Sequence, residues 1–246
     1  MVKLGTVPYL NALPLVSGID CEIYTAPPAL LARQAAENDI ILAPIVTAFL
    51  DPSWHLLEGV GIGSFGAVET VRLFLNDTNV TIQNLNTIYT DLESLTSVAL
   101  LKILLSLPYN RDLTSIHFTG DKKETAQGSL LIGDKVWEQD PSLKSLDLGE
   151  CWTKWTGLPF LFACWMTKNP ALGKEWKPKL VANLKKNSGD LESLVQKFPA
   201  EKQKRLLKYW RQLVYDVGPA QKNAVALFQK YWTEMEQKPQ RELNWI

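Results

Sequence analysis

The sequence predicts an α/β protein of two lobes with a ligand-binding cleft between them. Its 246 residues are many for a single hydrophobic core and suit two lobes of about 100–150 residues each. In the N-terminal half, short apolar strands alternate with helical segments, which is typical of parallel strands covered by helices. Two extended stretches, 67–76 and 160–167, are expected to cross between the lobes and form a hinge.

The expected lobes are discontinuous in sequence. We expect residues 1–85 and 168–246 to form one lobe and residues 86–167 to form the other. From about residue 175 onward the pattern becomes helical and polar, so these helices should cover the first lobe. The basic run 202–211 is interleaved with core positions, which favours a solvated helix face over a nucleic-acid site.

Composition excludes several function classes. Lys and Arg total 26, as do Asp and Glu, so no net charge favours nucleic acid or an anionic membrane as a partner. The three cysteines include no CxxC pair, and their odd number argues against a disulfide framework. The N-terminus lacks the basic head and continuous apolar run of a signal peptide, and no apolar run reaches membrane-spanning length. We therefore expect a cytoplasmic protein.

The first strand, 2–7, is followed by a loop that contains Pro8 and Pro14. These prolines disfavour a helix and hold Tyr9 and Asn11 at the carboxyl edge of the strand, where open α/β sheets bind ligands. The next expected elements are a strand at Cys21–Tyr24, a helix at Ala29–Glu37 and a buried strand at Ile40–Pro44.

A glycine-containing turn follows. Two extended segments, 56–62 and 67–76, are joined by Gly63-Ser64-Phe65-Gly66. The glycines allow a sharp bend and a close approach to a ligand, and Ser64 and Thr70 offer hydroxyl groups. A structural hairpin explains the glycines equally well.

The segment 87–107 predicts a short strand and then a buried helix. Ser94 is the expected N-cap, Thr96 and Ser97 lie in the first turn, and the following residues are apolar nearly all round the helix until Pro108 ends it. Free N–H groups and hydroxyls at a helix start bind anions without a cationic side chain. Simple capping by Ser94 is an equally good explanation.

Asp134 closes the apolar strand 129–132. It is a candidate acid or base at the sheet edge, but N-capping of a helix at 135–139 is favoured by its position. The remaining expected elements are strands at Ser115–Thr119 and Leu161–Met166 and helices at Lys177–Asn187, Gly189–Phe198, Ala200–Asp216 and Pro219–Glu236.

Several motifs occur in a fixed order over most of the chain. They are Val7-Pro8-Tyr9-Leu10-Asn11, Ser64-x-Gly66-x-Val68, Ser94-x-Thr96-Ser97, Leu131-Ile132-Gly133-Asp134, and Asp147-Leu148-Gly149 through Trp152 to Thr156-Gly157-Leu158-Pro159-Phe160. Together they resemble the chorismate dehydratase family, which opens the futalosine route to menaquinone.

The resemblance implies a periplasmic-binding-protein type II fold used inside the cell. It also implies a hydro-lyase that converts chorismate to 3-[(1-carboxyvinyl)oxy]benzoate and water without a metal or organic cofactor. His55 and His117, the only histidines, have no metal-ligand spacing. The implied catalytic residues are Asn11 and Ser94, and the implied substrate-binding residues are Tyr9, Ser64, Gly66, Thr70, Thr96, Ser97, Asp134, Thr156 and Gly157.

The chain departs from the family pattern at two places. Leu95 stands where the family has an arginine, and Ala67 and Thr70 replace a proline and a serine. The alternative function is therefore a non-catalytic carboxylate-binding protein, or a degenerate paralogue, of the same fold. For the enzyme, our hypothesis is that the enolpyruvyl carboxylate of the substrate takes the proton, since Asp134 is the only obvious protein base.

Overall fold

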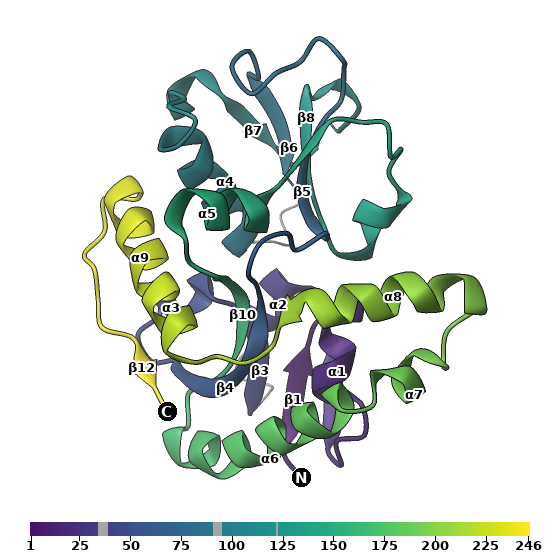
Figure 1. Ribbon diagram of the computed structural model, residues 1–246. Helices are drawn as coiled ribbons and strands as arrows, with labels where there is room; N and C mark the ends of the chain where they lie inside the picture. The colour runs from purple at the N-terminus through teal and green to yellow at the C-terminus, as the bar shows by residue number, and fades with distance from the viewer. Residues whose placement is uncertain (34–38, 91–94, 122) are drawn as a thin grey trace.

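The chain folds around two β-sheets, each flanked by helices (Figure 1). The structure is a computed structural model that describes residues 1–33, 39–90, 95–121 and 123–246. The two sheets lie one above the other in Figure 1, with both chain termini beside the lower one. No helix within the described ranges is long and apolar enough to cross a membrane.

The first sheet has the strand order β11-β4-β10-β3-β1-β2, and β12 also pairs with β4. Its strands are β1 (Lys3–Thr6), β2 (Glu22–Thr25), β3 (Ile40–Pro44), β4 (His55–Ser64), β10 (Phe160–Thr167), β11 (Leu213–Val214) and β12 (Asn244–Trp245). β1 is parallel to β2 and β3, whereas β10 is antiparallel to β3 and β4. Every residue of β3 is buried, which explains why that strand is apolar throughout.

The second sheet has the strand order β7-β6-β8-β5-β9. Its strands are β5 (Val71–Leu75), β6 (Thr87–Thr90), β7 (His117–Thr119), β8 (Gly128–Ile132) and β9 (Ser145–Asp147). β6 is parallel to β7 and β8, and β5 is antiparallel to β8 and β9.

Helices surround both sheets. They are α1 (Leu13–Val16), α2 (Pro28–Arg33), α3 (Val46–Leu50), α4 (Leu95–Ser106), α5 (Leu148–Thr156), α6 (Pro170–Ser188), α7 (Leu191–Val195), α8 (Ala200–Gln212) and α9 (Pro219–Met235), with 3₁₀ turns η1 (Leu10–Ala12), η2 (Leu113–Ser115), η3 (Lys123–Thr125) and η4 (Gly133–Glu138). α4 is buried along most of its length, as its apolar sequence predicts. α9 contacts β10 of the first sheet and also α4, which follows β6 of the second sheet.

The sheets divide the chain at points that differ from the expected lobe boundaries. The expected ranges 1–85 and 86–167 place β5 with the first sheet and β10 with the second. In the structure β5 pairs with β8 and β9, and β10 pairs with β3 and β4. The chain therefore crosses between the sheets before β5 and returns before β10. Because β4 and β5 lie in different sheets, the glycines between them do not form a hairpin.

Three helices also differ from expectation. α5 was not predicted; it forms because the Asp147 side chain accepts the Glu150 N–H, and it ends at Gly157 in a left-handed conformation. α6 begins before the expected 177–187 helix, since Asn169 caps it and the chain stays helical through Pro178. α8 ends at Gln212, because the next residues pair with β4 as β11.

Candidate functional site

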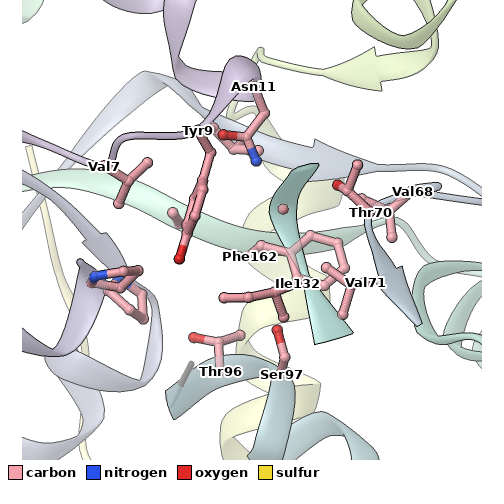
Figure 2. A pocket seen from close by; sticks show the side chains of 15 residues that line it. Val7, Tyr9, Asn11, Val68, Thr70, Val71, Thr96, Ser97, Ile132 and Phe162 are labelled. Atoms are coloured by element: carbon pink, nitrogen blue, oxygen red, sulfur yellow. The ribbon is translucent and has the colours of Figure 1, made fainter. Parts of the chain in front are cut away.

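A cavity lies between the two sheets (Figure 2). The space among its lining atoms, including the opening to solvent, is about 550 Å³. It is lined by Val7, Tyr9, Asn11, Pro28, Pro44, Ile62, Val68, Thr70, Val71, Thr96, Ser97, Ile132, Gly133, Phe162 and Ala163. The loop after β1 and the last residue of β3 contribute to this wall, so the cavity lies at the carboxyl edge of parallel strands, as predicted.

The polar groups of the cavity face one another across apolar walls. Figure 2 shows Asn11 and Thr70 on one side of the space and Thr96 and Ser97 on the other. Among the lining residues that the structure describes, none carries an ionisable side chain other than the phenol of Tyr9. The site therefore offers hydroxyls, an amide and backbone groups to a ligand.

The start of α4 forms one end of the cavity. Thr96 and Ser97 are buried, and the Val46 N–H donates to Thr96 Oγ1 at 3.4 Å. A threonine hydroxyl that accepts a hydrogen bond still has its own hydrogen to donate. The expected N-cap and catalytic residue Ser94 lies outside the described residues. With the helix dipole, the first turn of α4 suits a carboxylate.

The loop that carries Tyr9 and Asn11 is held by residues distant in sequence. Trp210 Nε1 donates to the Leu10 carbonyl at 2.8 Å, and the Tyr215 hydroxyl donates to the Asn11 carbonyl at 3.0 Å. The Asn11 Oδ1 atom is buried and has no hydrogen-bond partner among the described residues. A buried oxygen without a donor is uncommon in proteins.

Tyr209 lies behind the wall and was missed by sequence reasoning. Its buried phenolic oxygen is 2.6 Å from Oγ1 of the lining residue Thr70. Burial raises the pKa of Tyr209, so the phenol stays protonated at ordinary pH. Tyrosine in an amphipathic helix most often packs in the core, and no sequence signal distinguished this one.

Asp147 fixes the crossing segment that bears Val68 and Thr70. Its carboxylate accepts the N–H groups of Val68 at 3.0 Å and Glu69 at 2.8 Å while it caps α5. Burial raises the pKa of Asp147, whereas the three N–H donors and the nearby Arg72 oppose that shift. The position of Thr70 at the cavity thus depends on a buried carboxylate of the second sheet.

Several residues implied by the resemblance do not line the cavity. Ser64 Oγ donates to the Gly66 carbonyl at 3.0 Å, and the Gly66 N–H donates to Thr153 Oγ1 at 2.9 Å. Thr156 donates to the Trp152 carbonyl, and Gly157 ends α5. These groups shape the turn before β5 and the end of α5.

Asp134 lies in η4 and is absent from the cavity lining. η4 begins at Gly133 with Ile132 as its N-cap, so Asp134 lies inside the first turn and the expectation of an N-cap is wrong. Instead its carboxylate accepts the Leu10 backbone N–H, which ties the second sheet to the loop after β1. Burial raises the pKa of Asp134, and that hydrogen bond opposes the shift.

The apolar residues of the cavity wall were also missed. Valine, isoleucine and phenylalanine in strands usually belong to the hydrophobic core, so the sequence alone does not assign them to a pocket. Gly133 shows how tightly the wall is packed. Its φ is +66°, and a Cβ at this position would lie 2.8 Å from the Tyr9 ring. Within the described ranges, no group of three or more His, Cys, Asp or Glu side chains gathers where it could hold a metal ion.

Similar crystal structures share the two-lobed architecture. Protein AF1704 from Archaeoglobus fulgidus is 15% identical, with a TM-score of 0.68 over 96% of this chain and 97% of that one. The periplasmic aliphatic sulphonate binding protein SsuA from Escherichia coli is 13% identical, with a TM-score of 0.67 over 99% and 89%. A Candida albicans protein with the generic periplasmic binding protein fold is 11% identical, with a TM-score of 0.59 over 98% and 92%.

At these identities the similarity shows the fold, which is that of the periplasmic binding proteins, as expected. A family comparison goes further than fold. Residues 2–234 match the model of a family described as menaquinone biosynthesis. That match includes every strand of both sheets except β12, together with the loop that carries Asn11 and the start of α4. The chain therefore belongs to the menaquinone biosynthesis family.

Proposed function

We propose that this protein is a chorismate dehydratase, which converts chorismate to 3-[(1-carboxyvinyl)oxy]benzoate and water in the futalosine pathway of menaquinone biosynthesis. The observation that supports it most is the cavity: apolar walls with amide and hydroxyl groups at opposite ends, in a member of a menaquinone biosynthesis family. The proposed enzyme acts in the cytoplasm on a small molecule and uses no cofactor.

The cavity suits a carbocyclic dicarboxylate. Val68, Ile132 and Phe162 offer apolar surfaces to the ring. One carboxylate lies at the start of α4 in our proposal, where Thr96 and Ser97 accompany the helix N–H groups. The second lies near Thr70.

Asn11 hydrogen-bonds the substrate in this proposal, and Tyr9 covers one side of the ring. From the resemblance we also assign Ser94 to catalysis. Ser64, Gly66, Thr156 and Gly157, which the resemblance places in substrate binding, serve in our proposal to shape the segments around the cavity.

The reaction breaks the C–O bond of the ring hydroxyl and removes a neighbouring ring proton, so that water leaves and the ring becomes aromatic. Asp134 is bound to the Leu10 backbone and not in the cavity lining. We therefore retain the hypothesis that the enolpyruvyl carboxylate of the substrate takes the proton. The protein then contributes positioning and hydrogen bonds to the developing charge.

The test is incubation of the purified protein with chorismate, following the loss of diene absorbance and the mass of the product. A product one water lighter, formed without added cofactor, is expected. Asn11→Ala should lower kcat/KM by about 100-fold, because it removes a group that touches the reacting ring. Asn84→Ala removes the same kind of side-chain amide from an exposed turn between β5 and β6. This control variant should leave kcat/KM within about twofold.

A second candidate is a carboxylate-binding protein without activity, favoured by Leu95 in place of the family arginine. SsuA, which shares the fold, is a sulphonate binding protein. Thermal stabilisation by chorismate without turnover would support this candidate and contradict the dehydratase. Absence of both turnover and stabilisation would contradict both candidates.

A further inference from the structure

One face of α8 contacts the place where the chain crosses from the first sheet to the second. Arg205, Lys208, Tyr209 and Gln212 are spaced as i, i+3, i+4 and i+7, so their side chains lie on one side of the helix. We call these four residues the crossing face of α8. The helix belongs with the first sheet, since β11 follows it directly and pairs with β4.

Two residues of the crossing face bind the crossing segment itself. Gln212 Nε2 donates to the Ala67 carbonyl at 3.1 Å, and Lys208 Nζ lies 3.6 Å from Glu69 Oε1. The Lys208 side chain is exposed, and an exposed ion pair contributes little to stability. These two contacts position α8 beside the crossing, before the first residue of β5.

The other two residues reach past the crossing to η4, which directly follows β8 of the second sheet. The guanidinium carbon of Arg205 lies 4.5 Å from the centroid of the Trp137 ring, which is a cation–π contact. The Tyr209 ring meets the same indole edge to face, with centroids 5.1 Å apart and 83° between the ring planes. Trp137 is thus a point at which α8 contacts the second sheet's side of the molecule.

The cavity between the sheets is enclosed in this conformation. Thr70 and Thr96, which lie on opposite sides of it in Figure 2, are only 1% and 2% exposed. A carbocyclic acid can therefore come between them only after the two sheets have moved apart. That movement must separate Trp137 from Arg205 and Tyr209, because the indole lies on the side of the second sheet and α8 on the side of the first.

We propose that the contacts of Arg205 and Tyr209 with Trp137 form a clamp that sets how fast a ligand enters and leaves the cavity. All three residues lie outside the cavity lining that the structure describes, so the clamp is the same whether the cavity is filled or empty. A contact common to both states slows entry and release by the same factor and leaves the dissociation constant unchanged. The clamp goes beyond the proposed function, since it serves an enzyme and a binding protein alike.

The test uses Arg205→Ala, which shortens an exposed side chain and leaves the core unchanged. The probe is 3-[(1-carboxyvinyl)oxy]benzoate, which the proposed enzyme releases and does not consume. Stopped-flow tryptophan fluorescence gives its association and dissociation rate constants, and titration calorimetry gives its dissociation constant. We expect both rate constants to rise together by about two- to fivefold, the range for an exposed cation–π contact. The dissociation constant should stay within about twofold.

Lys204→Ala is the matched control. Lys204 is an exposed cation next to Arg205, but its side chain points about 100° away around the helix. Its loss removes the same charge and keeps the clamp, so any change in association must come from weaker attraction of the anionic probe. We expect no acceleration. In a Trp137→Leu background, Arg205→Ala should cause no further acceleration, since Arg205 acts through Trp137.

Unchanged rate constants in Arg205→Ala would overturn the clamp. So would faster release with unchanged association and a matching rise of the dissociation constant, because Arg205 would then bind the ligand itself. Acceleration by Arg205→Ala in the Trp137→Leu background would also overturn it. None of these results bears on turnover of chorismate, so the proposed function stands or fails separately.

A measurement without ligand decides the matter if the protein binds neither chorismate nor the probe, a result that would contradict the proposed function alone. The N–H groups in the first turn of α4 have no acceptor within the helix, so enclosure by the cavity protects them from exchange with solvent. Their hydrogen exchange should accelerate by about two- to fivefold in Arg205→Ala and stay unchanged in Lys204→Ala. Equal exchange in both variants would overturn the clamp.

Discussion

The carboxylate of Asp147 accepts the backbone N–H of Glu69 at 2.8 Å, and Glu69 is held there with a φ of +64°. That left-handed conformation is uncommon for a residue with a side chain. It lies immediately before Thr70, where the chain crosses from the first sheet to the second. A single buried carboxylate thus stabilises a bend that the backbone would not adopt readily by itself.

Asp147→Asn should lower the free energy of unfolding by about 2–3 kcal/mol, because its amide nitrogen cannot accept the N–H groups that the second carboxylate oxygen accepts. The reduced desolvation cost of a neutral side chain offsets only part of that loss. Urea denaturation measures the change. Asp140→Asn is the control: Asp140 also accepts a backbone N–H, from Ser142, but is fully exposed. Equal changes in the free energy of unfolding of both variants would show that the buried hydrogen bonds of Asp147 stabilise the protein no more than the exposed one of Asp140.

Gly133→Ala should destabilise the protein more than Gly157→Ala. Both glycines have a left-handed φ, +66° and +71°, so alanine costs about 1–2 kcal/mol at either position. Only at Gly133 would the new Cβ meet the Tyr9 ring, at 2.8 Å. Thermal unfolding of both variants gives the difference. Matching melting temperatures would mean that Tyr9 moves aside at no cost.

The stability of the protein should depend on the protonation of Asp134. Burial raises the pKa of Asp134 above its ordinary value of 3.8, so the folded protein takes up this proton at higher pH than the unfolded chain. Its contribution is fully present below the unfolded pKa and is lost as pH rises through the folded pKa. Relative to Asp134→Asn, the unsubstituted protein should therefore lose stability as the pH rises above about 3.8.

Asp112 provides the control with the opposite sign. Hydrogen bonds from Thr114 hold the pKa of Asp112 below its ordinary value. Relative to Asp112→Asn, the contribution of Asp112 should be fully present above its ordinary pKa of 3.8 and should be lost as the pH falls below that value. Urea titrations at several pH values measure both differences, and slopes of the same sign would contradict the assignment for Asp134.

Thr6→Val should stabilise the protein by about 1 kcal/mol. Thr6 is buried in β1, and its hydroxyl has no hydrogen-bond partner among the described residues. Valine has the same shape and suits a strand. Thr167→Val should instead destabilise it by about 1–3 kcal/mol, since this buried hydroxyl donates to the Asp39 carbonyl and accepts the Asn169 N–H. Chemical denaturation distinguishes the two, and a destabilised Thr6→Val would show that its hydroxyl is satisfied.

Sequence reasoning succeeded where local pattern decides structure. The strand 40–44 and the helix that begins at Leu95 consist mostly of apolar residues, and this composition alone predicted that both are buried. It failed where a tertiary partner decides: residues 71–75 form a strand in either sheet, and only pairing with β8 and β9 settles which. α5 was missed because its cap, Asp147, precedes a segment rich in tryptophan, threonine and glycine.

The residues of the candidate site also fall into those that sequence position reveals and those that only tertiary contacts reveal. Tyr9, Asn11, Thr70, Thr96 and Ser97 line the cavity because they occur at strand ends, at the crossing or at a helix start, positions that a sequence reveals. Ser64 and Thr156 have the same polar character, yet their hydroxyls bond to nearby carbonyls. Tyr209 of α8 contacts the lining residue Thr70 from behind, and no local feature of that helix indicates it.

The loop that carries Asn11 is synthesised long before the residues that hold it in place. Trp210 and Tyr215 follow the carbonyls that they bind by 200 and 204 residues. At about 5–20 residues per second, a ribosome needs roughly 10–40 s between making the loop and making its supports. The cavity wall therefore stays unfinished on the nascent chain, and a truncated product lacking α8 would hold the loop without its anchors.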